Sequence, residues 1–407
     1  MSASVLAQLT LGYRYLWNRR RQAAAVELFV QTAPGATGVD ARHLVSSLTE
    51  LWPARAPRLL LSIRQGVLLH DMLVHGLADG AWIAVPQQAL DNPVLRERVQ
   101  QALARGLPLV WQGGPGQQPD PELAGRFQLG MYTLDETQAV QALRAVRERQ
   151  PHAPATPDAA APLPEGQVLQ APPSRVLADW ALDQQGAWAV AGWPLEELLE
   201  QLRHQPGGPS REVIELLLRA IDRDASLAQL EEQLNTDPVL AYRFLAHINQ
   251  PALKLRGPID TLERGLMVLG LKHVQEWLRG QLAQASAEAD LRPLRLQLVT
   301  RAHLLEHLLD PGDEAELRRE LYLCGLFSQL DNLLGQPLAT ALERLPLSQR
   351  ILQALLEHSG PYHPALQLAR ALEGGQTRTT QQLCESYGFA QEEVNRALLR
   401  TLIGQSG

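Results

Sequence analysis

Lysine is almost absent from this sequence. Of its 37 basic residues, Lys254 and Lys272 are lysines and the others are arginines. Because lysine is the usual catalytic amine and the cation of phosphate-binding loops, this shortage excludes several chemistries at once. The 44 acidic residues give a formal net charge of −7, which argues against a protein that mainly neutralises nucleic-acid phosphates. No nucleic-acid partner is therefore expected.

Cysteine and long apolar runs are also scarce. Cys324 and Cys384 cannot build a disulfide framework or a cysteine-rich zinc site. Each lies in an apolar helical pattern, which is typical of a buried, reduced thiol. No stretch approaches the ~20 apolar residues that span a bilayer, and residues 1–17 lack the pattern of a signal peptide. We therefore expect a cytoplasmic protein without a membrane partner.

The composition is that of a folded protein, with 45% hydrophobic and 20% charged residues among 407. The first half alternates short apolar runs with amphipathic stretches, a pattern that favours a parallel sheet or a barrel of α/β class. Glycine and proline bound the runs, as is typical of strands. The predicted strands are residues 23–30, 58–63, 81–86, 106–111, 126–132, 166–170 and 187–193.

The alternation covers about 200 residues, whereas a complete eight-stranded barrel takes about 250. We therefore predict a reduced or distorted barrel. Residues 152–164 are rich in proline and alanine, and because the alternation resumes after them we interpret them as a flexible loop within this domain. Proline and glycine cluster again at 204–210, where the period changes. The predicted domains are thus residues 1–203 and 211–407.

The second half is predicted to be entirely helical, a compact bundle without repeats. Asp237 followed by Pro238 is typical of a helix start. Asp260 and Glu263 resemble a capping box, and Gly270 predicts the end of that helix. Further helices are predicted at residues 293–309, 313–334, 338–345, 348–358, 364–372 and 391–403.

Spaced motifs in this half resemble the HDOD domain, a helical signalling module related to HD-domain phosphohydrolases. The resemblance covers residues 211–372. Within that family, this half is similar to the branch of HDOD domains that is found fused behind an EAL domain. The matching segments are residues 237–240, 247–252, 258–262, 268–271, 301–302 with Glu306, 323–328, 334–338 and 345–348.

The first half resembles a degenerate EAL domain, the barrel that hydrolyses cyclic di-GMP in bacteria. Residues 12–13 and 18–21 resemble its start, 25–29 fall where its signature strand lies, and 186–194 resemble its last strand. The resemblance implies an EAL–HDOD signalling protein. Its fold class is α/β plus all-α: a reduced, degenerate EAL-like barrel of TIM type, followed by an all-helical HDOD domain.

The EAL reaction needs several carboxylates and an amide that hold two cations, and a lysine near the activated water. On the resemblance, Glu27 is the retained carboxylate, a vestigial EAL position, and Ser62 stands where the family has asparagine. Residues 82–86 contain no acid, and residues 111–114 offer none where the family has paired aspartates. The lysine is missing near residues 132–135, and residues 168–171 lack the later glutamate. Because one carboxylate cannot hold two hard cations, we predict no metal and no catalysis there. Glu27 is then expected to be a solvated or capping residue at a strand end.

HD-domain hydrolases bind metal through a histidine–aspartate pair. The resemblance places that pair at Ser328 and Gln329, so the HD positions are lost and no metal is expected. The dipeptide His70–Asp71 falls in the other domain, where an ordinary surface helix explains it better.

His303 and His307 are four residues apart on a predicted helix, with Glu306 between them. This pattern could hold zinc, but surface histidines are the preferred interpretation because no third ligand is evident. Arg19, Arg20 and Arg21 could contact a nucleotide phosphate, although three arginines at a strand entry are more often solvated.

Two further patterns favour structural explanations. Residues 112–118 are glycine-rich but lack the lysine of a phosphate-binding loop. Three tryptophans that cluster in sequence are expected to pack in the core, although an exposed one would instead mark a partner surface. They are Trp180, Trp188 and Trp193.

Two scaffolds without their metal ligands predict a non-catalytic signalling adaptor that needs no cofactor. The implied partners are other bacterial signalling proteins, such as diguanylate cyclases, sensor kinases or regulators of motility and biofilm. The alternative is a sensor that binds cyclic di-GMP or another nucleotide without hydrolysis. A third hypothesis is an unrelated, zinc-dependent enzyme. The sequence leaves the oligomeric state open.

Overall fold

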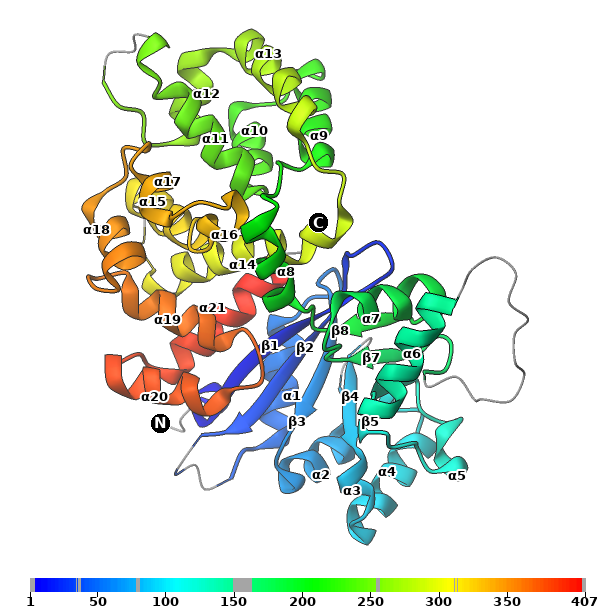
Figure 1. The fold of residues 1–407 in the computed structure, drawn as a ribbon. Helices are drawn as coiled ribbons and strands as arrows, with labels where there is room; N and C mark the ends of the chain where they lie inside the picture. The colour runs from blue at the N-terminus through cyan, green and yellow to red at the C-terminus, as the bar shows by residue number, and fades with distance from the viewer. Residues whose placement is uncertain are drawn as a thin grey trace. The chain divides into compact units, whose positions relative to one another are not determined.

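The computed structural model describes residues 4–33, 35, 38–77, 81–148, 163–253, 257–310, 312 and 314–404, without the side chains of 145, 147 and 148. The chain forms two compact units (Figure 1). The barrel unit comprises Met1–Pro194 together with Ala371–Gly407, and the helical unit comprises Leu195–Arg370. The division therefore differs from the predicted domains at both ends of the helical unit. Residues 152–162 of the predicted loop lie outside the described residues.

Eight strands close into a barrel. All seven predicted strands are present, and Leu9–Trp17 adds an eighth that the sequence reading missed, which corrects the expected reduction. This first strand pairs antiparallel with both neighbours, whereas the others run parallel. The strands are β1 (Leu9–Trp17), β2 (Ala23–Thr32), β3 (Arg58–Ile63), β4 (Trp82–Pro86), β5 (Leu109–Pro115), β6 (Leu129–Thr133), β7 (Val168–Gln170) and β8 (Ala189–Ala191).

One buried cluster takes a side chain from every strand and fills the barrel interior. Trp82 and Trp188 pack against each other at its edge, with ring centroids 5.3 Å apart. Because side chains alternate along a strand, this cluster fixes which residues point inward. Its members are Leu16, Ala25, Leu60, Trp82, Ala84, Val110, Met131, Val168, Ala189 and Ala191.

Helices follow most of the parallel strands, as the alternation predicts. Asp40 and Asn92 cap two of them by accepting hydrogen bonds from backbone N–H groups of the first turn. The helices are α1 (Ala41–Leu51), α2 (Gly66–His75), α3 (Gln87–Leu90), α4 (Pro93–Ala104), α5 (Pro121–Ala124), α6 (Glu136–Glu148) and α7 (Arg175–Asp179), the last continued by a π-helical turn, η2 (Trp180–Gln184).

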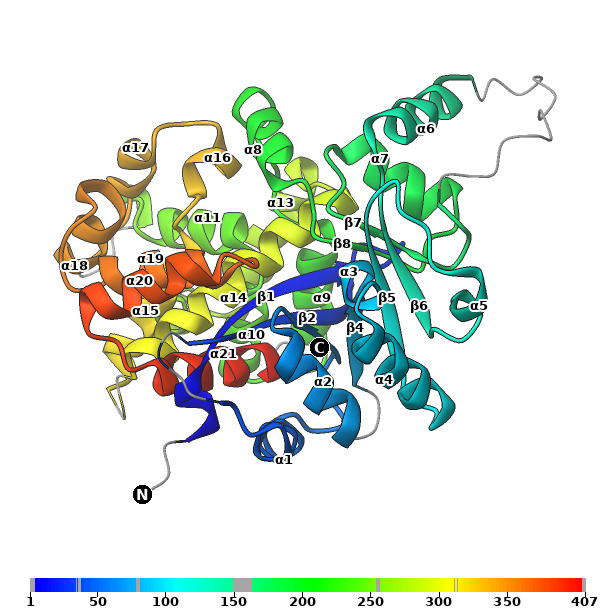
Figure 2. The ribbon, with the colours of Figure 1, turned by 90° about the horizontal axis from the view of Figure 1, so that it is seen from below.

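The C-terminal helices α20 (Thr377–Tyr387) and α21 (Gln391–Gly404) belong to the barrel unit and lie beside β1 (Figure 2). Asn395 is fully buried. Its amide donates to the carbonyls of Leu6 (2.8 Å) and Leu9 (2.7 Å), and its oxygen accepts from the Leu11 N–H (3.3 Å). These bonds tie α21 to the 3₁₀ turn η1 (Val5–Gln8) and to β1, and thereby satisfy backbone groups that the barrel leaves unpaired.

The helical unit is built from twelve α-helices and short turns among its described residues. The helices are α8 (Leu195–His204), α9 (Arg211–Asp222), α10 (Leu227–Asn235), α11 (Pro238–Ile248), α12 (Leu262–Leu269), α13 (Leu271–Gln281), α14 (Arg292–Leu309), α15 (Ala315–Leu326), α16 (Leu330–Leu334), α17 (Leu338–Leu342), α18 (Gln349–Leu352) and α19 (His363–Leu372). The turns are η3 (Pro251–Leu253), η4 (Leu282–Gln284), η5 (Ala289–Leu291) and the π-helical η6 (Gln353–Glu357).

Three local details differ from the prediction. The predicted helix 313–334 is broken into α15 and α16, and residue 313 lies outside the described residues. The predicted helix 348–358 is a short α18 that continues into a π turn. The cap of α12 is Thr261, whose hydroxyl accepts from the Arg264 N–H (3.3 Å), rather than Asp260. The predicted cap at Asp237 and the stop at Gly270 are confirmed.

Asp237 explains why the predicted boundary at 204–210 lies inside the helical unit. Its carboxylate is fully buried and accepts from the N–H groups of Ser210 (2.7 Å) and Leu240 (2.8 Å). It also pairs with Arg295 at 3.1 Å, and the same guanidinium donates to the carbonyl of Gly208 (2.8 Å). A side chain at Gly208 would lie 2.2 Å from a backbone oxygen, so glycine serves close packing there and not flexibility.

No helix of the described residues combines the length and the apolar character needed to cross a bilayer.

Candidate functional site

Glu27 lies in the middle of β2 and faces the barrel interior. It is fully buried, which corrects the expectation of a solvated or capping residue. Arg14, directly opposite on β1, donates to it from Nε at 2.9 Å, and the Ser62 hydroxyl donates at 2.6 Å. A charged hydrogen bond from arginine and one from a hydroxyl occupy both carboxylate oxygens.

The strand ends around Glu27 decide whether the barrel can hold metal. On each parallel strand from β2 to β7, the residue two positions after the last member of the interior cluster also points into the barrel. Among these described residues, Glu27 alone carries a carboxylate. Gln112 and Gln170 hydrogen-bond each other at 3.1 Å. Two divalent cations need many more hard oxygen donors, so this ring does not fit them. The ring consists of Glu27, Ser62, Pro86, Gln112, Thr133 and Gln170.

The three arginines 19–21 lie in the turn that joins β1 to β2, before β2 begins. Six residues of extended chain separate Arg21 from Glu27, or about 20 Å, so the structure does not bring them together. Arg21 is buried and pairs with Asp179 and Asp183, each at 2.6 Å. Arg19 lies 3.5 Å from Asp183, and these ion pairs lower the pKa of that carboxyl. Contact with a nucleotide would have to break them.

Ser328 and Gln329, the predicted lost HD positions, follow α15. Ser328 is buried, and its hydroxyl accepts a hydrogen bond from Arg301 at 2.7 Å. Arg370 donates to its carbonyl at 3.0 Å. The position predicted for the metal-binding pair is thus next to a buried guanidinium of α14, and a metal ion does not fit beside that charge.

The remaining histidine patterns have local partners. His303 bonds Glu306 at 2.9 Å and packs on Tyr322. On α2, Nδ1 of His70 lies 3.0 Å from a carboxylate oxygen of Asp71. Its Nε2 accepts a hydrogen bond from Nε of Arg98 on α4 at 3.2 Å. Within the described ranges, no three histidine, cysteine or acidic side chains converge as a metal site would require.

The glycine-rich stretch and the tryptophans have structural explanations. Gln117 accepts a hydrogen bond from the Gly114 N–H at 2.7 Å, so the loop after β5 is closed on itself. The Trp180 and Trp193 side chains are buried, and Trp188 packs partly buried against the interior cluster.

Both cysteines are buried free thiols, as predicted. Burial raises the pKa of the Cys324 thiol to about 12 and that of Cys384 to about 11. At pH 8 about one Cys384 side chain in a thousand is therefore a thiolate. We expect native protein at pH 8 to incorporate iodoacetamide far more slowly at both positions than protein unfolded in guanidinium, as measured by mass spectrometry. Rapid labelling of the native chain would contradict the buried, protonated state.

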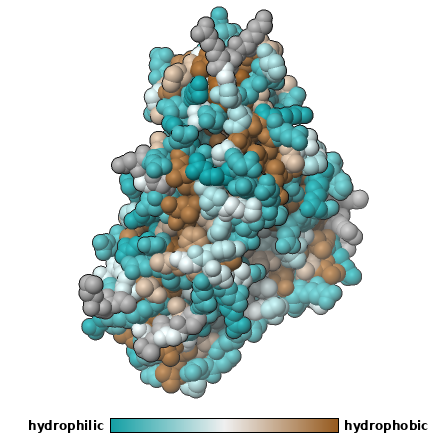
Figure 3. Space-filling view, turned by 90° about the vertical axis from the view of Figure 1, so that its left-hand side faces the viewer, coloured by the Kyte–Doolittle hydropathy of each residue, from teal (hydrophilic) through white to brown (hydrophobic). Residues whose placement is uncertain are grey.

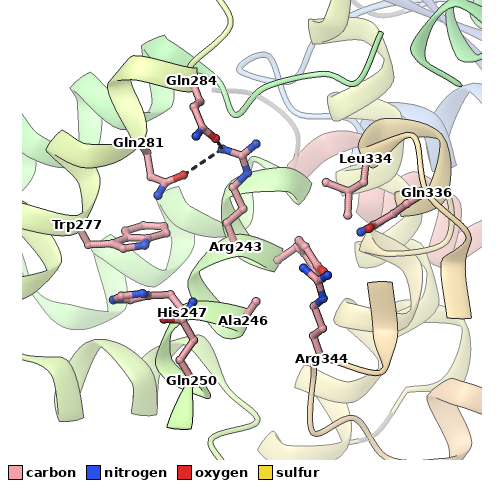
Figure 4. A pocket seen from close by; sticks show the side chains of 11 residues that line it. Arg243, Ala246, His247, Gln250, Trp277, Gln281, Gln284, Leu334, Gln336 and Arg344 are labelled. Carbon is pink, nitrogen blue, oxygen red and sulfur yellow. Dashed lines mark hydrogen bonds between the residues drawn. The ribbon is translucent and has the colours of Figure 1, made fainter. Parts of the chain in front are cut away.

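A surface pocket of about 390 Å³ lies in the helical unit (Figure 4). Its lining comes from α11, α13, η4 and the segment from α16 to residue 344. In Figure 4, Trp277 and His247 lie on one side of Arg243, and Arg344 lies across the pocket. The lining residues are Tyr242, Arg243, Ala246, His247, Gln250, Trp277, Gln281, Gln284, Leu334, Gln336 and Arg344. The sequence patterns do not predict this site, because its residues come from segments that lie far apart in the chain.

Residues 210–345 match the HDOD domain family, so the helical unit contains an HDOD domain. Two curated relatives share 25% identity with the chain. One is the uncharacterized protein YuxH of Bacillus subtilis, over 173 residues that are 42% of this chain and 42% of that protein. The other is the cyclic di-GMP phosphodiesterase CdgJ of Vibrio cholerae, over 188 residues, 46% of this chain and 43% of that protein. The chain therefore matches less than half the length of each relative.

Solved structures show only remote similarity. The MmoQ response regulator of Methylococcus capsulatus has a TM-score of 0.29 and 20% identity, over 46% of this chain and 73% of that one. BlrP1 of Klebsiella pneumoniae, in a complex with calcium and cyclic di-GMP, has a TM-score of 0.29 and 14% identity, over 48% of this chain and 57% of that one. The HDOD domain and the related phosphodiesterase support a signalling role.

Proposed function

We propose that this chain is a non-catalytic signalling adaptor whose barrel is a degenerate EAL domain. The observation that carries the proposal is the state of Glu27. Its two oxygens are occupied by Arg14 and Ser62, and the other positions of the strand-end ring, Ser62, Pro86, Gln112, Thr133 and Gln170, supply no further carboxylate. An internal guanidinium thus neutralises the charge that a cation would balance in a hydrolase of this type.

The helical unit supports the same proposal independently. Arg301 and Arg370 both donate to Ser328 at the position of the lost HD pair. These two guanidinium groups already supply positive charge at this position, which disfavours a metal cation beside them. What each unit then contributes is shape and surface, and these suit recognition of another protein.

Exposed apolar side chains offer surfaces for such partners. Val67 on α2 is 79% exposed and Val94 on α4 is 64% exposed. On the face shown in Figure 3, apolar residues gather in small patches between hydrophilic ones. Small, mixed patches fit transient contacts with signalling proteins such as diguanylate cyclases, sensor kinases or regulators of motility and biofilm.

A phosphodiesterase assay tests the absence of catalysis. We expect the purified chain to release no linear product from cyclic di-GMP with Mg²⁺ or Mn²⁺ above the protein-free background, because the ring around Glu27 cannot hold the cations. An active phosphodiesterase in parallel shows that the assay works. Turnover above the background would overturn the proposal, and its loss in Glu27→Gln, which removes the charge that pairs with Arg14, would assign the activity to the barrel.

A nucleotide sensor is the second candidate function. In the barrel it would depend on arginines 19–21, of which Arg19 and Arg21 are held by aspartates. The pocket of the helical unit favours it more, because it presents arginines beside aromatic rings.

A further inference from the structure

The charge of the pocket in the helical unit is opposite to that of the chain. Arg243 and Arg344 line it, and no aspartate or glutamate is among its lining residues, although the whole sequence carries a net charge of −7. The carboxylate that acts on Arg243, Asp237, is buried and paired with Arg295. The pocket is therefore a local positive field, which selects an anion.

The two guanidinium groups have donors to spare. Nη1 of Arg243 donates to the side-chain oxygens of Gln281 (3.1 Å) and Gln284 (2.9 Å), which fixes the group and leaves Nε and Nη2 available. Arg344 is exposed and has no hydrogen-bond or ion-pair partner among the described residues. A fixed guanidinium and an adjustable one facing the same cavity suit the oxygens of a phosphate.

A second polar group without a partner belongs to Tyr242, another residue that lines the pocket. Tyr242 is 4% exposed, and no group in the described ranges hydrogen-bonds its buried hydroxyl. An unsatisfied buried hydroxyl is unfavourable, and a hydrogen bond to a polar ligand would relieve that cost. The same ring packs edge-on against Phe327, with centroids 6.4 Å apart.

A pair of stacked aromatic rings, the Trp277–His247 platform, lies beside Arg243. The rings of His247 and Trp277 are stacked, with centroids 5.9 Å apart and planes 26° from parallel. Phe244 supports the indole edge-on at 5.1 Å. Burial lowers the pKa of His247, so the platform is uncharged at neutral pH. Such surfaces bind nucleobases by stacking, and the amides of Gln250 and Gln336 can pair with base edges.

We propose that this pocket binds a nucleotide with one base, which stacks on the Trp277–His247 platform while its phosphate lies between Arg243 and Arg344. The volume of about 390 Å³ is near the small end of ligand pockets, about 300–1,000 Å³. It suits one base with its sugar and phosphate better than two. The proposal goes beyond the adaptor role and does not depend on it.

Isothermal titration calorimetry of the full chain tests the proposal. The probes are guanosine and adenosine monophosphates, cyclic di-GMP, guanosine and inorganic phosphate. We expect a mononucleotide to bind at least tenfold more tightly than phosphate or guanosine alone. Arg344→Ala should weaken that binding at least tenfold, whereas Arg264→Ala, which removes an exposed arginine of α12 outside the pocket, should not.

Trp277→Leu separates base recognition from phosphate recognition. We expect it to bring mononucleotide affinity close to that of inorganic phosphate, with an unchanged circular dichroism spectrum. The proposal is overturned if no mononucleotide binds at millimolar concentration, or if Arg344→Ala binds like the natural chain. Tighter binding of cyclic di-GMP than of any mononucleotide would overturn the single-base assignment. Binding of an acidic peptide instead of nucleotides, sensitive to Arg344→Ala, would reassign the pocket to a protein partner. The phosphodiesterase assay is independent of all these outcomes.

Discussion

Asn395→Ala is expected to lower the free energy of unfolding of the barrel unit by about 3–5 kcal/mol. The substitution leaves the carbonyls of Leu6 and Leu9 and the N–H of Leu11 without their partner. Each buried, unsatisfied backbone group costs about 1–3 kcal/mol. Seven of the eight tryptophans lie in the barrel unit and Trp277 lies in the helical unit, so denaturant unfolding followed by tryptophan fluorescence reports mainly on the barrel.

Two variants accompany this measurement. Arg400→Ala changes an exposed residue of the same helix and should alter stability by less than about 0.5 kcal/mol. Asn395→Asp keeps the acceptor for Leu11 and loses both donors, so its unfolding midpoint should also fall. If Asn395→Ala unfolds at the same denaturant concentration as Arg400→Ala, the C-terminal helix does not hold the barrel as the structure indicates.

Asp237→Ala should cost the helical unit about 3–5 kcal/mol, because it strands the buried guanidinium of Arg295. It also removes the cap of α11 and the acceptor of the Ser210 N–H. Far-ultraviolet circular dichroism during denaturation follows this unit, which is almost entirely helical.

The matched control for this second substitution is Glu215→Ala, an exposed acid in the middle of α9. Asp237→Asn keeps an acceptor for the cap but loses the charge, and we expect it to fall between the other two variants. Equal stability of Asp237→Ala and Glu215→Ala would show that the contacts around Asp237 contribute little.

Glycine and proline boundaries with apolar runs between them were enough to predict seven strands of the barrel. They did not predict β1, although Leu9–Trp17 contains the threonine, tyrosines and tryptophan typical of strands. Its sequence even alternates apolar with polar or small residues over 9–15. It was missed because neither residues 1–8 nor residues 18–22 contain a glycine or proline to mark its ends. Its absence from the prediction also made the barrel look reduced. A short hairpin joins β1 to β2, so this strand adds neither a helix nor many residues to the strand–helix alternation.

The candidate site was predictable only in part. The resemblance identified Glu27 and Ser328 as positions of interest, but their partners Arg14 and Arg301 depend on strand register and helix packing. The segments of α20 and α21 were assigned to the helical half because the sequence pattern from residue 211 onward is helical, although of the two only 391–403 was predicted as a helix. Their contacts with β1 depend on the three-dimensional path of the chain, which periodicity does not contain.

The barrel unit is discontinuous in sequence, and this affects how the protein is made. Residues 195–370 are synthesised between Met1–Pro194 and Ala371–Gly407, the two segments that together form the barrel unit. At about 5–20 residues per second, these 176 residues (370 − 194) take about 9–35 s. During that interval β1 lacks α20 and α21, the helices that lie beside it in the folded barrel unit. The barrel unit can therefore be completed only after the whole helical unit has been made.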